Sequence, residues 1–180
     1  VRSRAGRALV HNTGYYTLNT VPGGALKSTA VGAAEDGTAG AGSKKRPNTM
    51  PASWADGPDV ELNLGTKPGL KYDETVLMVD AGAKVKLTFS NSDDMLHNLV
   101  IVKPGDAVDK VAELSMKLGL KGEEMNYVPE SDLILYHTGI LQPETSETLY
   151  FTAPKEPGYY MYVCTFPGHA QVMRGTLLVE

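Results

Sequence analysis

The chain lacks several features that would assign its class at once. It has a single cysteine, Cys164, so no disulfide can form within the chain. No apolar run approaches the roughly 18 to 20 residues that a membrane-spanning helix needs. The chain begins at Val1 without a recognisable signal peptide, so we expect a processed form or an excised domain that has lost its targeting signal. Its apolar content of 42% is nevertheless enough for a packed core.

The first 57 residues lack the periodicity of regular structure. Gly, Ala, Ser, Thr and Pro dominate residues 21–53, and this composition buries too little apolar surface to offset the entropy lost on ordering. Residues 1–57 carry a net charge of +4 and the remaining residues carry −8. We therefore predict a flexible, basic leader or linker over 1–57 and a folded domain over 58–180. The more apolar residues 9–18 could instead form a short strand or a docking arm.

From Asp59 onward the chain is typical of short strands separated by turn residues. Val85, Leu87 and Phe89 alternate with polar residues, which indicates a strand with one buried face. A helical spacing of apolar residues appears once, between 106 and 120. Strands are expected near residues 60–64, 75–79, 85–89, 97–102, 133–137, 147–152, 159–163 and 175–179. The pattern predicts an all-β fold of about eight strands, a sandwich or a barrel, with one inserted α-helix.

The last seventeen residues contain three metal-binding side chains at close spacing. Four residues separate Cys164 from His169, and three separate His169 from Met173. A thiolate, an imidazole and a thioether on one short loop favour a soft, redox-active metal, above all copper. A lone cysteine is, however, most often a small buried hydrophobic residue.

A second histidine is needed to complete a trigonal copper site, and His97 is the candidate. It opens an apolar segment over 97–102, and strand ends are where a rigid scaffold presents functional groups. The alternative is a histidine that is simply hydrogen-bonded at a strand end. Of the other two histidines, we interpret His137 as a solvent-facing strand residue and His11 as a bystander in the leader.

Two separated motifs together resemble the cupredoxins, specifically the azurin and auracyanin branch. "MLHNLVIV" is followed about 60 residues later by "YMYVCTFPGHAQVMRGTLLVE", and the resemblance covers roughly 59–180. It implies the cupredoxin fold, a Greek-key β-sandwich, with one type 1 copper ion. By this resemblance His97, Cys164 and His169 are equatorial ligands and Met173 is the weak axial ligand. Copper coordination would remove the thiol proton.

The resemblance also implies residues that support the ligands. Asn98 should tie the two ligand loops together by bonding the backbone around Thr165, and Phe166 should pack near the metal and keep the sulfur dry. Leu96 stands where azurins have a glycine whose carbonyl is a distant fifth contact. Leu96 is thus the candidate for a carbonyl contact, and its bulk favours a site closer to four-coordinate.

We expect one-electron transfer by a mononuclear type 1 copper cycling between Cu(II) and Cu(I), and no enzymatic activity, because no coordination position is left open for a substrate. The main alternative is a type 1 copper relay domain excised from a larger redox enzyme; a copper carrier and a structural zinc site are further ones. The expected partners are redox proteins such as cytochromes, and not nucleic acid. The resemblance implies a periplasmic or otherwise extracytoplasmic location, with a membrane tether upstream of residue 1 as one arrangement. Docking is expected at an apolar patch around His169 formed by Met95, Leu96, Pro167, Ala170 and Val172.

Overall fold

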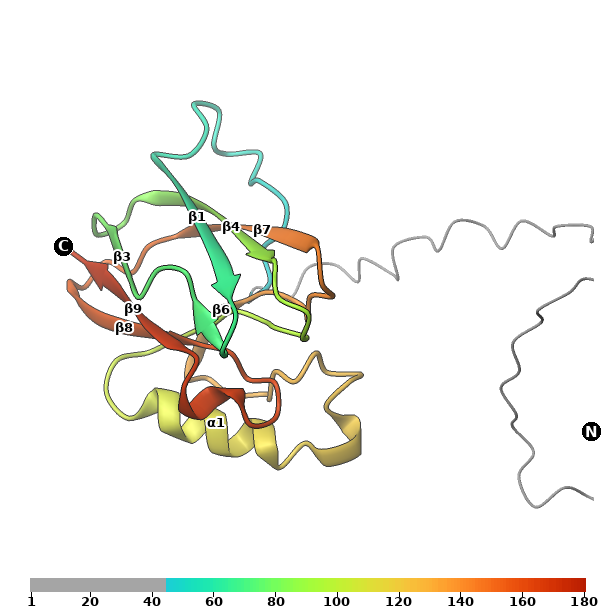
Figure 1. Cartoon of the computed structure of the whole chain (residues 1–180). Helices are drawn as coiled ribbons and strands as arrows, with labels where there is room; N and C mark the ends of the chain where they lie inside the picture. The colour runs from blue at the N-terminus through green and yellow to red at the C-terminus, as the bar shows by residue number, and fades with distance from the viewer. Residues whose placement is uncertain (1–44) are drawn as a thin grey trace, which may run out of the picture. The chain divides into compact units, whose positions relative to one another are not determined.

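The computed structural model describes residues 45–180, which form two mixed β-sheets (Figure 1). Residues 9–18 and His11 lie outside this part of the chain. The four-stranded sheet has the order β2 (Lys71–Tyr72), β1 (Val60–Lys67), β4 (Lys84–Asn91), β7 (Thr145–Thr152). The five-stranded sheet has the order β3 (Val76–Val79), β9 (Arg174–Val179), β8 (Gly158–Val163), β5 (Val100–Val102), β6 (Ile134–His137).

The main core is built from the alternating apolar residues of the strands. On β4, Val85, Leu87 and Phe89 are fully buried, as their spacing predicts. They pack in one cluster with residues from β8 and β9 of the other sheet, including Tyr162 and Leu177. The two sheets therefore enclose a shared apolar layer, and the predicted β-sandwich is confirmed.

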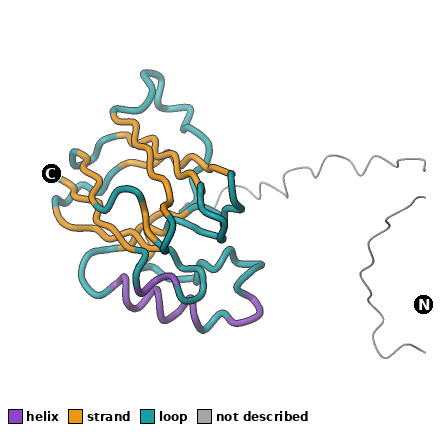
Figure 2. The backbone as a smooth tube through the Cα atoms, in the orientation of Figure 1, coloured by secondary structure: helices purple, strands orange, loops and turns teal. Residues whose placement is uncertain are grey.

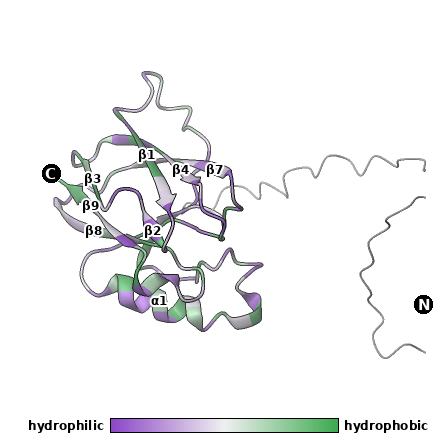
Figure 3. Cartoon of the chain, viewed as in Figure 1, coloured by the Kyte–Doolittle hydropathy of each residue, from purple (hydrophilic) through white to green (hydrophobic). Residues whose placement is uncertain are grey.

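One α-helix is inserted between two strands, as predicted. Helix α1 (Ala107–Met116) is followed by the 3-10 turn η1 (Gly119–Lys121), and Figure 2 shows both on one side of the strands. Figure 3 shows that α1 carries both hydrophobic and hydrophilic residues. Its apolar residues Val108 and Val111 pack in a second cluster with β5 and β8. Within residues 45–180, no helix is long and apolar enough to cross a membrane.

The structure differs from the sequence prediction around His97. Strand β5 starts at Val100, and His97 lies before it, paired only with Leu141 through an isolated bridge with N···O distances of 3.3 and 2.7 Å. The Thr138 hydroxyl accepts a hydrogen bond from the backbone N–H of Leu99 at 3.0 Å, so this N–H bonds to a side chain and not to the backbone of a neighbouring strand. The two-residue strand β2 was also not predicted, which gives nine strands in the described residues instead of about eight.

Residues 45–57, which composition assigns to the linker, pack against the sandwich. The Arg46 guanidinium donates two hydrogen bonds to the Glu147 carboxylate, at 2.7 and 3.0 Å. Trp54 is only 8% exposed and meets Tyr150 of β7 edge to face, with ring centroids 6.4 Å apart. We propose that the folded unit begins before residue 58.

The packing of Trp54 can be tested by mutation. We expect Trp54→Ala to lower the free energy of unfolding by about 3 kcal/mol, because a large buried ring leaves a cavity. Met50→Ala is the matched control, since Met50 lies in the same segment but is 44% exposed. Urea unfolding of both variants provides the measurement. Equal stabilities would show that this segment contributes nothing to the fold.

Candidate metal centre

Three potential metal ligands from distant parts of the chain meet in the interior. His97 precedes β5, Cys164 directly follows β8, and His169 opens the 3-10 turn η2 (His169–Gln171). The Cys164 sulfur lies 3.8 Å from Nδ1 of His97 and 3.5 Å from Nδ1 of His169, and the two Nδ1 atoms are 3.2 Å apart. The three side chains are buried, and their donor atoms all lie within 4.8 Å of one another.

The donor set fits a single metal ion. Ligands that each stand about 2.0 to 2.3 Å from a metal are separated from one another by roughly 3 to 4 Å, as these three atoms are. Both imidazoles present the same type of nitrogen, Nδ1, to the sulfur and to each other. Two nitrogen lone pairs facing one another at 3.2 Å repel unless a proton or a cation lies between them. The thiol and the two imidazoles are the donors that copper prefers.

Met173 is brought back toward the three donors by the turn that carries His169. The backbone N–H of Met173 donates to the His169 carbonyl at 2.9 Å, and the N–H of Cys164 donates to the Met173 carbonyl at 3.1 Å. Gly168 has a φ of +86°, a conformation that L side chains rarely adopt, so glycine suits this turn. Met173 is fully buried in the same core cluster as Cys164.

Asn98 and Thr165 connect the two loops that carry the ligands. The Asn98 carbonyl oxygen accepts the backbone N–H of Thr165 at 2.7 Å, and its amide donates to the Thr165 hydroxyl at 2.8 Å. The same amide donates to the carbonyl of Asn126 at 2.8 Å. Asn98 and Thr165 are both buried, so the hydrogen bonds between them are shielded from competition with water.

Phe166 covers one side of the centre. Its ring centroid lies 4.8 Å from that of His169 and 4.9 Å from that of Tyr127, which it meets edge to face. Phe166 itself is partly buried against the main core. That Phe166 keeps water from the Cys164 sulfur stays a prediction.

Burial keeps the three donors uncharged in the absence of a metal. Burial raises the pKa of the Cys164 thiol to about 11, although hydrogen bonds from the backbone of Asn98 and Phe166 act to lower it. Burial also lowers the pKa of both imidazoles; an interaction with Asp93 partly offsets this effect at His97 and at His169. Metal binding at neutral pH must therefore displace the thiol proton, whereas the histidines are already neutral.

Asp93 also contacts the centre, although no motif in the sequence marks it. Its Oδ2 lies 3.2 Å from Nε2 of His97, the ring nitrogen that faces away from the sulfur. Burial raises the pKa of Asp93, but hydrogen bonds from Asp94 and His97 outweigh it, so the pKa lies below its ordinary value. The four-residue spacing between Asp93 and His97 is the only signal in the sequence, and such pairs are common on solvated surfaces.

The expected surface patch is only partly present. Val172 and Met95 are 59% and 42% exposed, and Pro167 is also exposed. Ala170 was expected in the patch, but it is buried and packs in the cluster beneath α1. His169 is 2% exposed, so its ring is almost entirely covered. Leu96 is half-buried, and a fifth contact from its carbonyl remains a prediction.

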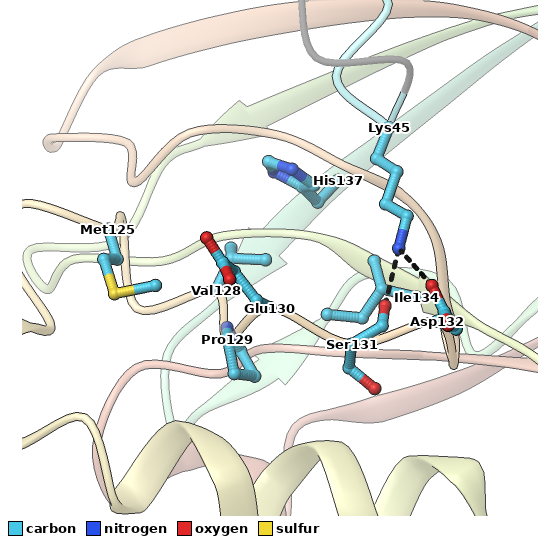
Figure 4. Close-up of a pocket in the computed structure, with 9 residues that line it drawn as sticks. All are labelled: Lys45, Met125, Val128, Pro129, Glu130, Ser131, Asp132, Ile134 and His137. Atoms are coloured by element: carbon cyan, nitrogen blue, oxygen red, sulfur yellow. Dashed lines mark hydrogen bonds and ion pairs between the residues drawn. The ribbon is translucent and has the colours of Figure 1, made fainter.

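His137, expected to face solvent, does so only in part. It is half-buried, burial lowers its pKa, and its Nδ1 is hydrogen-bonded to the Thr138 carbonyl at 2.9 Å. It lines a surface cavity of about 470 Å³ that contains none of the three metal-binding side chains (Figure 4). Lys45 extends along this cavity to the Ser131 carbonyl, at 2.6 Å, and to Asp132. The cavity is thus separate from the metal centre.

The β-sandwich and its buried His-Cys-His group together place the chain in the class of copper-binding β-sandwich proteins. Residues 59–180 match the family of copper binding proteins described as plastocyanin/azurin, and the chain belongs to that family. The resemblance seen in the sequence is thereby confirmed, and the group is positioned to bind one copper ion.

Individual relatives support the same assignment. Auracyanin-A of Chloroflexus aurantiacus is 33% identical over 124 residues, which are 67% of this chain and 75% of the relative. An azurin of Pseudomonas fluorescens biotype C is 30% identical over 131 residues, which are 68% of this chain and 99% of the relative. The crystal structure of dithionite-reduced auracyanin from Roseiflexus castenholzii superposes with a TM-score of 0.61 at 34% identity, over 69% of this chain and 99% of that one.

The metal-free protein should lose stability in acid. Both site histidines have a pKa below the ordinary value of 6.5, so the unfolded chain takes up protons that the folded one resists. Their stabilising effect is complete above about pH 6.5 and is lost as pH falls through the lowered values. Urea unfolding at about pH 7.5 and about pH 5 measures the loss. In His169→Gln the loss should be smaller, and an equal loss in both proteins would contradict this account.

Proposed function

We propose that this protein transfers one electron at a time through a single type 1 copper ion held by His97, Cys164, His169 and Met173. The observation that carries the proposal is the convergence of one sulfur and two Nδ1 atoms, 3.2 to 3.8 Å apart, in a buried centre. Met173, fully buried on the same loop, would supply a weakly bound thioether.

Copper bound by these residues would supply a Cu(II)/Cu(I) couple. The protein's part is to hold the donors in one arrangement that suits both oxidation states, so that little reorganisation accompanies each step. Cys164 and His97 are fixed by the Asn98–Thr165 hydrogen bonds, and the backbone bonds of Met173 fix the end of the loop. Phe166 and the surrounding core exclude water from the sulfur.

The same geometry supports an electron carrier and not an enzyme. Catalytic metal sites keep a coordination position open for water or substrate. Here the four side chains proposed as ligands are at most 2% exposed. A substrate would have to displace Phe166 or one of the ligands to reach the centre.

We also propose a location and a mode of docking. As the family resemblance implies, the protein acts outside the cytoplasm and exchanges electrons with other redox proteins. His169 is the exit for the electron, because its immediate neighbours Pro167, Gly168 and Val172 are exposed. Val172 directly follows η2, and its backbone N–H donates to the His169 carbonyl at 3.0 Å. A small apolar surface suits the brief encounters of redox partners.

Adding Cu(II) to the metal-free protein tests the proposed centre. We expect an intense visible charge-transfer band that saturates at one copper per chain, because the Cys164 thiolate binds the ion directly. Cys164→Ser should fold but give no such band. His137→Gln is the control, since that histidine lies outside the centre, and it should leave the band unchanged. A colourless wild-type complex would overturn the proposal.

The docking surface makes a separate prediction. In Val172→Asp, two copies that meet through this surface would bring like charges together. A repulsion of about 1.4 kcal/mol corresponds to a factor of ten, so we expect electron self-exchange to slow by about tenfold. Val76→Asp is the matched control, because Val76 on β3 is 53% exposed and lies on a different element. Magnetic resonance line broadening in mixtures of the two oxidation states measures the rate. If both variants slow exchange equally, the proposed surface is wrong.

A further inference from the structure

We propose that Asp93 is a positioning residue for His97 and that its carboxylate lowers the reduction potential of the bound copper. The inference rests on the proposed function, and it adds a residue outside the four ligands. Its basis is the contact between Oδ2 of Asp93 and Nε2 of His97 at 3.2 Å.

The contact selects the tautomer of His97. A carboxylate can only accept a hydrogen bond, so Nε2 carries the proton and donates it to Asp93. Nδ1 then presents its lone pair toward the Cys164 sulfur, 3.8 Å away. A carboxylate that accepts from the far nitrogen of a metal-bound imidazole also fixes the ring plane and makes the ligand more basic.

The carboxylate is itself held in place. Asn91, which is 1% exposed, donates its side-chain amide to the carbonyls of Met95 at 2.7 Å and Leu141 at 3.1 Å. The Asn91 side-chain oxygen accepts the backbone N–H of Asp93 at 3.1 Å. The turn that carries Asp93 is therefore anchored to the segment that pairs with His97, and its carboxylate does not depend on a flexible loop.

Burial gives the charge of Asp93 its effect. The side chain of Asp93 is 8% exposed and that of His97 is not exposed, so solvent screens the interaction between them weakly. A negative charge one imidazole away from the copper favours the more positive oxidation state. It should therefore stabilise Cu(II) over Cu(I) and lower the potential. Asp94, the next residue, is exposed, so its charge is screened by water.

Three variants separate charge from orientation. Asp93→Asn keeps an oxygen that can accept a hydrogen bond from the Nε2–H of His97 but removes the charge; Asp93→Ala removes both. Asp94→Asn removes the same charge one residue further along the exposed turn. The measurements are the reduction potential by voltammetry, the visible band and the Cu(II) dissociation constant. Thermal unfolding of the metal-free proteins identifies a variant that fails to fold. If Asp93→Ala does not fold, the comparison of Asp93→Asn with Asp94→Asn is the test.

We expect Asp93→Asn to raise the potential clearly more than Asp94→Asn while keeping the wild-type band. Asp93→Ala should in addition alter the band and weaken Cu(II) binding about 10- to 100-fold, as is typical when a support of a metal ligand is lost. Equal potentials in the two asparagine variants would overturn the role of the charge. An unchanged band and affinity in Asp93→Ala would overturn the positioning role. A wild-type protein without a blue band would instead be a failure of the proposed function.

Discussion

Two hydrogen bonds between Asn98 and Thr165 link the two segments that carry His97 and Cys164. His97 and Cys164 are far apart in the sequence, and each directly precedes one member of this pair. The bonds, at 2.7 and 2.8 Å, thus set the distance between an imidazole and a thiol that come from different loops. Both partners are buried, so losing one would leave a polar group unsatisfied at a cost of about 1–3 kcal/mol.

The β-sandwich supplies the rigidity on which this connection relies. The five-stranded sheet places β5 beside β8, so the segment before one strand and the residue after the other reach the same end of the sheet. Helix α1 closes the neighbouring side, where the Arg174 guanidinium donates to Asp109 of α1 at 2.8 Å and also to the Ala170 carbonyl. The loop that carries His169 is therefore tied to both strand and helix. A centre built this way is largely organised before metal binds, and metal that binds only the folded state adds to stability.

Patterns that are local in the sequence could be predicted, and contacts set by tertiary structure could not. Strand β4 could be predicted from the strict alternation of apolar and polar residues. The metal-binding motif could be predicted from its spacing and from its resemblance to the family. The start of β5 was misplaced because the backbone N–H of Leu99 bonds to the Thr138 hydroxyl, a partner that periodicity does not reveal. Asp93 was missed because its contact with His97 depends on the conformation of a turn that is held by the side chain of Asn91. Composition alone could not show that Trp54 packs on Tyr150.

The central claim is that one buried set of two imidazoles and a thiolate holds copper in both oxidation states with little rearrangement. X-ray absorption at the copper edge, recorded on the oxidised and the reduced protein, tests it most directly. We expect two nitrogen ligands and one short sulfur ligand in both states, with nearly unchanged distances. A copper environment without sulfur, or a change in the number of ligands on reduction, would contradict the account.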